Sequence, residues 1–110
     1  MKMPVLAYLT LPADHDPAQF CRPLLEARLA AGMNCLGPCR SLFHWKGELR
    51  DAAEWLIFAQ VPRDGFEAFR AAAVALHPYE NPCVLALPVE GGHAPFLEWV
   101  AAEAGGGACS

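Results

Sequence analysis

Residues 76–90, LHPYENPCVLALPVE, decide the fold of this chain. Leu76 ends an apolar pattern with helical spacing, and Pro78 and Pro82 flank a turn that a helix cannot cross. Residues 82–89 form a nearly continuous apolar run, which is typical of a strand. Pro88 cannot donate a hydrogen bond to a neighbouring strand, so this strand belongs at an edge of a sheet. The stretch therefore predicts a helix, a tight corner and an edge strand.

The segments before this stretch alternate between strand and helix patterns. Residues 5–9 are apolar on both alternating faces, as expected for a central strand covered on both sides. Asp16-Pro17 predicts the start of a helix, with a kink at Pro23 and a left-handed C-cap at Gly32.

A long hairpin and a second helix follow. Residues 33–61 alternate as two arms around Lys46-Gly47, and Gly37-Pro38 predicts a bulge in the first arm. Asp64 and Glu67 have the spacing of a capping box that opens a helix over 65–76.

The order of elements is β-α-β-β-α-β, followed by a short helix that carries Phe96, Trp99 and Val100. This order predicts an α+β, ferredoxin-like sandwich, in which two helices cover one face of a four-stranded antiparallel sheet. The expected strand order is 4-1-3-2, which places the first strand in the middle. Residues 1–104 are predicted to form a single domain, and residues 105–110 a flexible tail.

The composition indicates an oligomer. Of 110 residues, 55% are apolar and only 18% are charged, against about 25% charged in an average domain. We expect another subunit to cover part of this apolar surface, because the edge strand is apolar on both faces and the hairpin arms are long.

Several classes of protein are disfavoured by the sequence. The net charge is −4 and the eight basic residues are scattered, so nucleic acid is not an expected partner. No apolar run approaches the length of a membrane span, so direct membrane insertion is not expected. Five cysteines without a Cys-x-x-Cys pair favour reduced thiols and a cytoplasmic location. Without a nucleophile elbow or a phosphate-binding glycine loop, we predict that the chain is not an enzyme.

Several ordered motifs resemble the CutA divalent-cation-tolerance family from about Val5 to Trp99. The main ones are Ser41-x-Phe43-x-Trp45-x-Gly47, His77-Pro78-Tyr79-Glu80-x-Pro82, Leu87-Pro88-Val89 and Phe96-Leu97-x-Trp99. The resemblance implies a ferredoxin-like subunit in a homotrimer and a structural likeness to trimeric PII signalling proteins. It also implies a link to copper and other divalent metal ions, none of which is required for folding.

The chain departs from this family at three informative positions. Many relatives carry a cysteine where this chain has Gly32, and some carry another where Leu9 stands. A lysine common near the end of the third strand is replaced by Gln60. Thiol-based metal binding therefore does not carry over directly from the family.

The candidate metal ligands are His77, Glu80 and Glu90. Imidazole and carboxylate both suit a divalent transition metal, and imidazole suits copper especially. Glu90, after the last strand, could join the site from the same or a neighbouring chain. The alternative is that His77 and Tyr79 fix the corner by hydrogen bonding.

Four further residues are candidates for a ligand cleft or a subunit interface: Trp45, Lys46, Tyr79 and Trp99. Cys35 and Cys39 share strand parity and precede His44, so a Cys-Cys-His site for Cu(I) or zinc is one interpretation. The other interpretation of these cysteines is two small buried apolar side chains.

Two functions follow from these observations. The first is a homotrimeric divalent-cation tolerance protein that binds copper or another divalent metal ion. The alternative is a PII-like trimeric adaptor that binds a small metabolite or a protein partner in its intersubunit clefts.

Overall fold

The computed structural model describes residues 2–105 of the chain. The elements follow in the order β1 (Val5–Pro12), α1 (Pro17–Glu26), β2 (Gly32–Trp45), β3 (Glu48–Val61), a 3₁₀ turn (Arg63–Gly65), α2 (Phe66–Leu76), β4 (Val84–Pro88) and α3 (Ala94–Glu103). This is the predicted β-α-β-β-α-β order with an additional C-terminal helix, and the fold is ferredoxin-like α+β.

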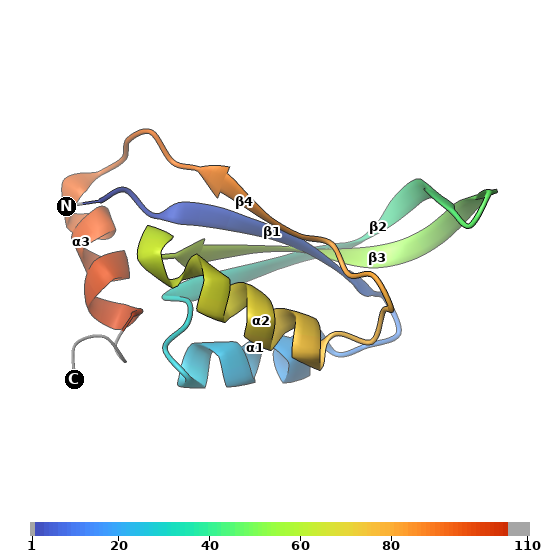
Figure 1. Ribbon diagram of the computed structural model, residues 1–110, viewed down its shortest axis with the longest axis horizontal. Coiled ribbons are helices and arrows are strands. Elements are labelled where there is room, and N and C mark those ends of the chain that lie inside the picture. Colours follow the sequence, from blue (N-terminus) through green and yellow to red (C-terminus); the bar gives the residue numbers. More distant parts are fainter. Residues whose placement is uncertain (1, 106–110) are drawn as a thin grey trace.

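The sheet has the order β2-β3-β1-β4, with antiparallel pairing throughout. The predicted central position of β1 and edge position of β4 are confirmed. β3 pairs with β1 only from Val61 back to Glu54. Beyond that point the hairpin continues as a two-stranded ribbon, which projects from the body of the molecule (Figure 1).

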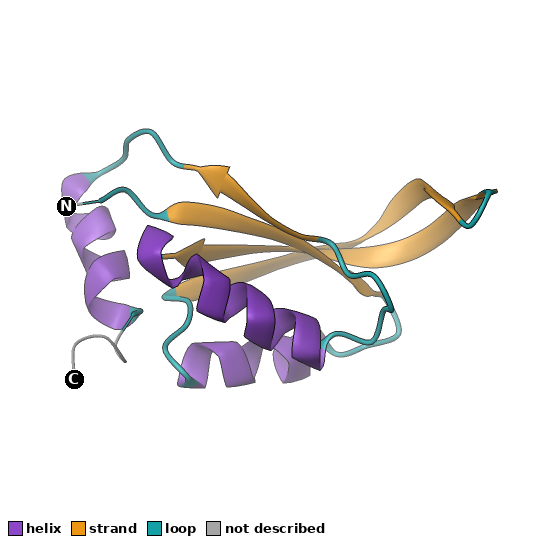
Figure 2. Cartoon of the chain, in the orientation of Figure 1, coloured by secondary structure: helices purple, strands orange, loops and turns teal. Residues whose placement is uncertain are grey.

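The core lies between the sheet and two helices. Figure 2 shows α1 and α2 on the same face of the sheet, and α3 at the end opposite the hairpin tip. Ala7, Leu9, Ile57 and Ala59 are fully buried on the covered face. These side chains pack against Phe69 and neighbouring apolar groups of the helices. The helices exclude water from this face of the sheet and leave the other face uncovered.

The predicted C-cap of the first helix is wrong. Asp16 does cap the start, accepting a 2.9 Å hydrogen bond from the Ala18 N–H. The helix ends at Glu26, and Arg28 takes the left-handed conformation with φ of 61°. Gly32 instead begins β2. Pro23 lies inside the helix, where it removes one backbone donor.

The predicted capping box before α2 is also wrong. Asp64 lies in the 3₁₀ turn and makes an exposed ion pair with Lys2 at 2.8 Å. Gly65 occupies the N-cap position, and no side chain caps the helix there. The 3₁₀ turn moves the first helical residue to Phe66, so Asp64 and Glu67 do not occupy the N-cap and N3 positions.

The predicted bulge at Gly37-Pro38 is confirmed, and it overturns the assumed parity of two cysteines. The register passes from Leu36 opposite Leu56 to Cys39 opposite Glu54, so β2 carries one extra residue here. Cys35 lies opposite Ile57 on the helix-covered face, whereas Cys39 shares the opposite face with Glu54. The predicted metal site that combines Cys35 and Cys39 is therefore wrong, because the two residues lie on opposite faces of the sheet.

The described chain ends next to α1. The Gly105 N–H donates a 2.8 Å hydrogen bond to the Arg28 carbonyl, and Arg28 also pairs with Glu103 at 2.8 Å. Residues 106–110 of the predicted tail lie outside the described residues. None of the helices in residues 2–105 has the length and apolar character needed to cross a membrane.

Candidate functional site

The corner between α2 and β4 is built around His77. Its ring is buried and packs edge-on against Phe20, with centroids 5.5 Å apart. Nε2 lies 2.6 Å from the Thr10 carbonyl, and Nδ1 accepts a 3.1 Å hydrogen bond from the Tyr79 N–H. Because a carbonyl oxygen can only accept a hydrogen bond, Nε2 must carry the hydrogen. Nδ1 accepts a hydrogen bond and carries none, so the ring is neutral. Burial lowers the pKa of His77, which keeps the ring neutral.

Tyr79 links the same corner to the hairpin. Its hydroxyl donates a 2.7 Å hydrogen bond to Glu54 Oε2, and Glu54 is only 4% exposed. Burial and the hydrogen bond to Glu54 raise the pKa of Tyr79 well above its usual value. The phenol therefore stays protonated and satisfies a carboxylate that is otherwise costly to bury.

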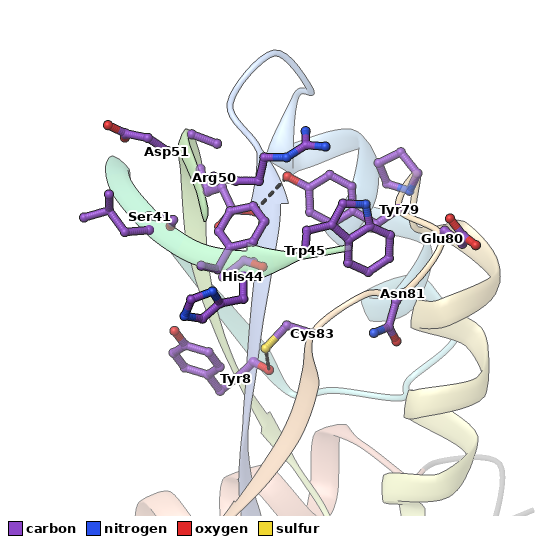
Figure 3. Close-up of a pocket in the computed structure, with 16 residues that line it drawn as sticks. Tyr8, Ser41, His44, Trp45, Arg50, Asp51, Tyr79, Glu80, Asn81 and Cys83 are labelled. Carbon is purple, nitrogen blue, oxygen red and sulfur yellow. Dashed lines mark hydrogen bonds between the residues drawn. The ribbon is translucent and has the colours of Figure 1, made fainter. Parts of the chain in front are cut away.

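A cleft of about 900 Å³ opens between the hairpin and this corner. Figure 3 shows side chains from β1, both hairpin arms and the connection before β4 around it. Aromatic and polar groups alternate in its wall, namely Tyr8, Thr10, Ser41, Phe43, His44, Trp45, Arg50, Asp51, Glu54, Tyr79, Glu80, Asn81 and Cys83. Its volume lies within the range of small-molecule sites.

Two of the candidate residues meet at the mouth of the cleft. Lys46 Nζ lies 3.5 Å from Glu80 Oε1, and the same ammonium lies 5.4 Å from the centre of the Trp45 ring. Both charged side chains are mostly exposed, so the ion pair is weak. Trp45 and Tyr79 line the cleft and Lys46 lies over the Trp45 ring, while their role in a ligand cleft or a subunit interface stays a prediction.

Glu90 and Trp99 are not part of the cleft wall. Glu80 precedes β4 and Glu90 follows it, so the two carboxylates are separated by a five-residue strand, about 17 Å long. Trp99 stacks on Phe96 with ring centroids 5.3 Å apart, and both are exposed on α3. The structure therefore does not gather the proposed metal ligands within one chain.

The described residues hold no group of three or more His, Cys, Asp or Glu side chains that could coordinate a metal ion. Both ring nitrogens of His77 are already hydrogen-bonded. The geometry thus favours the structural interpretation of His77 and Tyr79 over direct coordination.

Two of the positions at which this chain differs from the CutA pattern described above, Gly32 and Gln60, are in contact with each other. Gly32 pairs with Gln60 across the β2–β3 ladder. A Cβ atom at position 32 would lie 2.6 Å from Gln60 Oε1 and 3.5 Å from the Trp99 ring. A cysteine at position 32 therefore requires Gln60 to move, and the two departures accommodate each other.

Sequence reasoning missed Glu54 and the pairing of Cys21 with Cys35. The only signal for Glu54 is a carboxylate within an apolar alternating strand. Cys21 Sγ lies 3.7 Å from Cys35 Sγ, across the α1–β2 contact. Burial and the adjacent Cys35 thiol raise the pKa of Cys21 to about 12.

A family model described as the CutA1 divalent ion tolerance protein matches residues 5–103. This chain belongs to the CutA1 family. The CutA1 match includes every strand and reaches the end of α3, so it covers both the corner and the cleft.

Known CutA proteins resemble the chain in sequence and in structure. The divalent-cation tolerance protein CutA of Archaeoglobus fulgidus is 33% identical over 93 residues, covering 84% of this chain and 90% of that protein. The solved CutA1 of Thermus thermophilus has a TM-score of 0.89 at 29% identity, covering 94% of this chain and all of that chain. The solved A. fulgidus CutA, named as a periplasmic protein, has a TM-score of 0.87 at 32% identity, with 92% and 98% covered.

Proposed function

We propose that this member of the CutA1 family is a homotrimeric divalent-cation tolerance protein that binds copper or another divalent metal ion. The family match over residues 5–103 carries the proposal. We treat residues 1–104 as one CutA-like domain and assign no catalytic residue.

The trimer is supported by apolar surface that a single chain leaves uncovered. Leu36, Leu85 and Leu87 on the open face of the sheet are 51%, 53% and 42% exposed. Leu42 and Leu49 on the hairpin ribbon are 63% and 68% exposed. A two-stranded ribbon is marginally stable in water, so contact with neighbouring subunits would stabilise it. Sedimentation at micromolar concentration tests this: a trimer is expected, and a monomer contradicts it.

Metal binding by the predicted ligands needs donors from more than one subunit. Glu80 and Glu90 lie at opposite ends of β4 and both are exposed, so each is available to meet a donor from another chain. His77 must first release one of its two hydrogen bonds. We therefore rank Glu80 and Glu90 before His77 as ligands.

Titration of the purified protein with Cu²⁺ tests the metal proposal. A saturable step is expected in the wild type, weakened in Glu80→Gln and Glu90→Gln. Glu26→Gln, on the exposed surface of α1, is the matched control. An isotherm without saturation contradicts metal binding, and identical isotherms for all variants remove these ligands. If His77→Ala also leaves the isotherm unchanged, His77 is not a metal ligand and only holds the corner by its hydrogen bonds.

The second candidate function is a PII-like adaptor, and the cleft favours it. About 900 Å³ of space next to Trp45, Arg50 and Tyr79 suits an anionic metabolite with a planar group. A thermal-shift screen separates the two functions, since a ligand that binds only the folded state raises its stability. A metabolite that raises Tm while divalent metals do not would favour the adaptor.

We also propose a cytoplasmic location. The cysteines Cys21, Cys35, Cys39 and Cys83 are all free thiols, as a reducing compartment maintains them. The periplasmic A. fulgidus relative makes export the competing outcome. Cell fractionation with an antibody against the chain distinguishes the two.

A further inference from the structure

Outside the cleft, two cysteine thiols lie close together, those of Cys21 and Cys35. Cys21 comes from α1 and Cys35 from β2, and their sulfur atoms lie 3.7 Å apart. The bulge at Gly37-Pro38 places Cys35, but not Cys39, on the helix-covered face. The two thiols therefore meet through the fold, across 14 residues of sequence.

We propose that Cys21 and Cys35 form a two-thiolate binding site for Cu(I). This deepens the proposed metal function and rests on it for the choice of metal. On binding, each thiol loses its proton and each sulfur forms one bond to the ion. The products are a bis-thiolate copper(I) centre of charge −1 and two protons released to solvent.

The sulfur separation fits a shared metal better than a disulfide. A metal–thiolate bond is about 2.3 Å long, so two sulfurs on one ion lie roughly 3.8 Å apart at a tetrahedral angle and 4.6 Å apart when linear. The observed 3.7 Å matches a bent arrangement, and a linear two-coordinate ion requires the sulfurs to separate by roughly 0.9 Å more. A disulfide instead requires closure to about 2.05 Å.

The number and type of donors select the ion. The described residues hold no group of three or more His, Cys, Asp or Glu suited to a metal, so four-coordinate zinc lacks its ligands. Calcium and magnesium need several oxygen donors. Soft thiolates select Cu(I), which accepts as few as two of them.

The pair is accessible to an incoming ion. Cys35 is exposed, and Cys21, although 5% exposed, borders a surface depression of about 410 Å³. The depression is lined by Ala18, Cys21, Arg22, Leu25, Glu26 and Arg28. Arg28 is already paired with Glu103 at 2.8 Å, so Arg22 and Glu26 leave this lining without a net positive charge.

Anaerobic titration of the whole protein with Cu(I), in competition with a chromogenic Cu(I) chelator, tests the site. The wild type should take one Cu(I) per chain from the chelator, and X-ray absorption should show a sulfur-only first shell. Cys35→Ser should lose this step, and it should fold because its side chain is exposed. Cys21→Ala should lose it too, with circular dichroism to confirm folding. Cys39→Ser, on the same strand but the opposite face, should keep it.

Four outcomes would overturn the site. These are no Cu(I) uptake by the wild type, equal uptake by Cys35→Ser, loss of uptake in Cys39→Ser, and a Cys21–Cys35 disulfide that persists under reductant. A parallel Cu²⁺ titration of Cys35→Ser separates the two proposals. Saturable Cu²⁺ binding that survives without Cu(I) uptake leaves the proposed function standing and removes only this site.

Discussion

The two faces of the sheet differ more than any other pair of regions in the molecule. On the helix-covered face, Leu9 and Ile57 are fully buried, and their neighbours in β1 and β3 are equally enclosed. On the open face, Leu85 and Leu87 of β4 remain 53% and 42% exposed. The sheet thus carries apolar side chains on both faces, although the helices of the chain cover only one of them.

This contrast separates the surface that the chain covers with its own helices from the surface that it leaves exposed. The covered face is enclosed by α1 and α2, whereas the open face has an apolar composition without a covering layer. The corner at 77–79 joins them, because His77 packs on the covered side against Phe20 and Tyr79 reaches Glu54 on the other. Substitutions on the two faces should therefore have different kinds of effect.

Leu9→Ala should cause the largest loss, because it leaves a cavity in the covered face. Removing a fully buried leucine side chain costs about 2–5 kcal/mol of unfolding free energy. Denaturant unfolding at fixed protein concentration measures it. Val74→Ala, 39% exposed on α2, is the control and should stay within about 1 kcal/mol. Equal losses for both variants would break the contrast between the faces.

Leu87→Asp should weaken assembly rather than folding of the subunit. A carboxylate buried at a subunit interface without a partner costs roughly 3 kcal/mol or more, which is about a hundredfold in association. Analytical ultracentrifugation should show dissociation, with the far-ultraviolet circular dichroism unchanged. Val74→Asp on α2 should leave the assembly intact. An unchanged Leu87→Asp assembly would mean that the open face is not the interface.

Tyr79→Phe should cost about 1–3 kcal/mol of unfolding free energy, because buried Glu54 loses its hydroxyl donor. The pKa of Tyr79 is raised in the folded state, so its contribution is complete below the unfolded pKa of about 10 and falls as pH rises above it. The difference between wild type and variant should therefore shrink in strongly alkaline buffer. A pH series of denaturant midpoints measures this, and a constant difference would contradict the assigned hydrogen bond.

His77 should give a smaller, pH-dependent effect on the covered side. Its pKa is lowered in the folded state, so below about pH 6.5 the unfolded chain binds the proton first. Below about pH 6.5 the free energy of unfolding should fall by at most about 1.4 kcal/mol per pH unit. Above that pH the neutral His77 ring contributes its full stabilisation. Midpoints at pH 7 and pH 5 measure the change. His77→Gln should reduce the dependence, whereas exposed His93→Gln should leave it unchanged, and an unchanged dependence in His77→Gln would contradict the role of His77.

The sequence predicts features that depend on local pattern. The central β1, the edge position of β4 and the turn at Lys46-Gly47 all follow from alternation, proline chemistry and turn residues. The end of α1 does not, because Arg28 adopts a left-handed conformation that its side chain disfavours. Just after the end of this helix, the Arg28 carbonyl accepts a hydrogen bond from the Gly105 N–H. The two residues are separated by most of the chain, so no local pattern predicts the contact.

The candidate site was predicted only in part. The motifs offer Trp45 and Tyr79 as separate candidates for a ligand cleft or a subunit interface, but only the structure shows that both line one cleft. Burial of Glu54 depends on a hydroxyl 25 residues away, which no local pattern reveals. The separation of Glu80 from Glu90 follows from the intervening strand, once β4 is known to run straight between them.

The bulge at Gly37 also limits the insertions and deletions that β2 can accept. One extra residue between Leu36 and Cys39 sets which face each later β2 side chain occupies. Deleting it would exchange the two sides for every residue from Cys39 to Trp45, and would turn the wall of the cleft outward. Gly37 has φ of 127°, and a Cβ there would lie 2.8 Å from the Cys39 nitrogen. Single-residue deletions in this strand should therefore be more damaging than most substitutions along it.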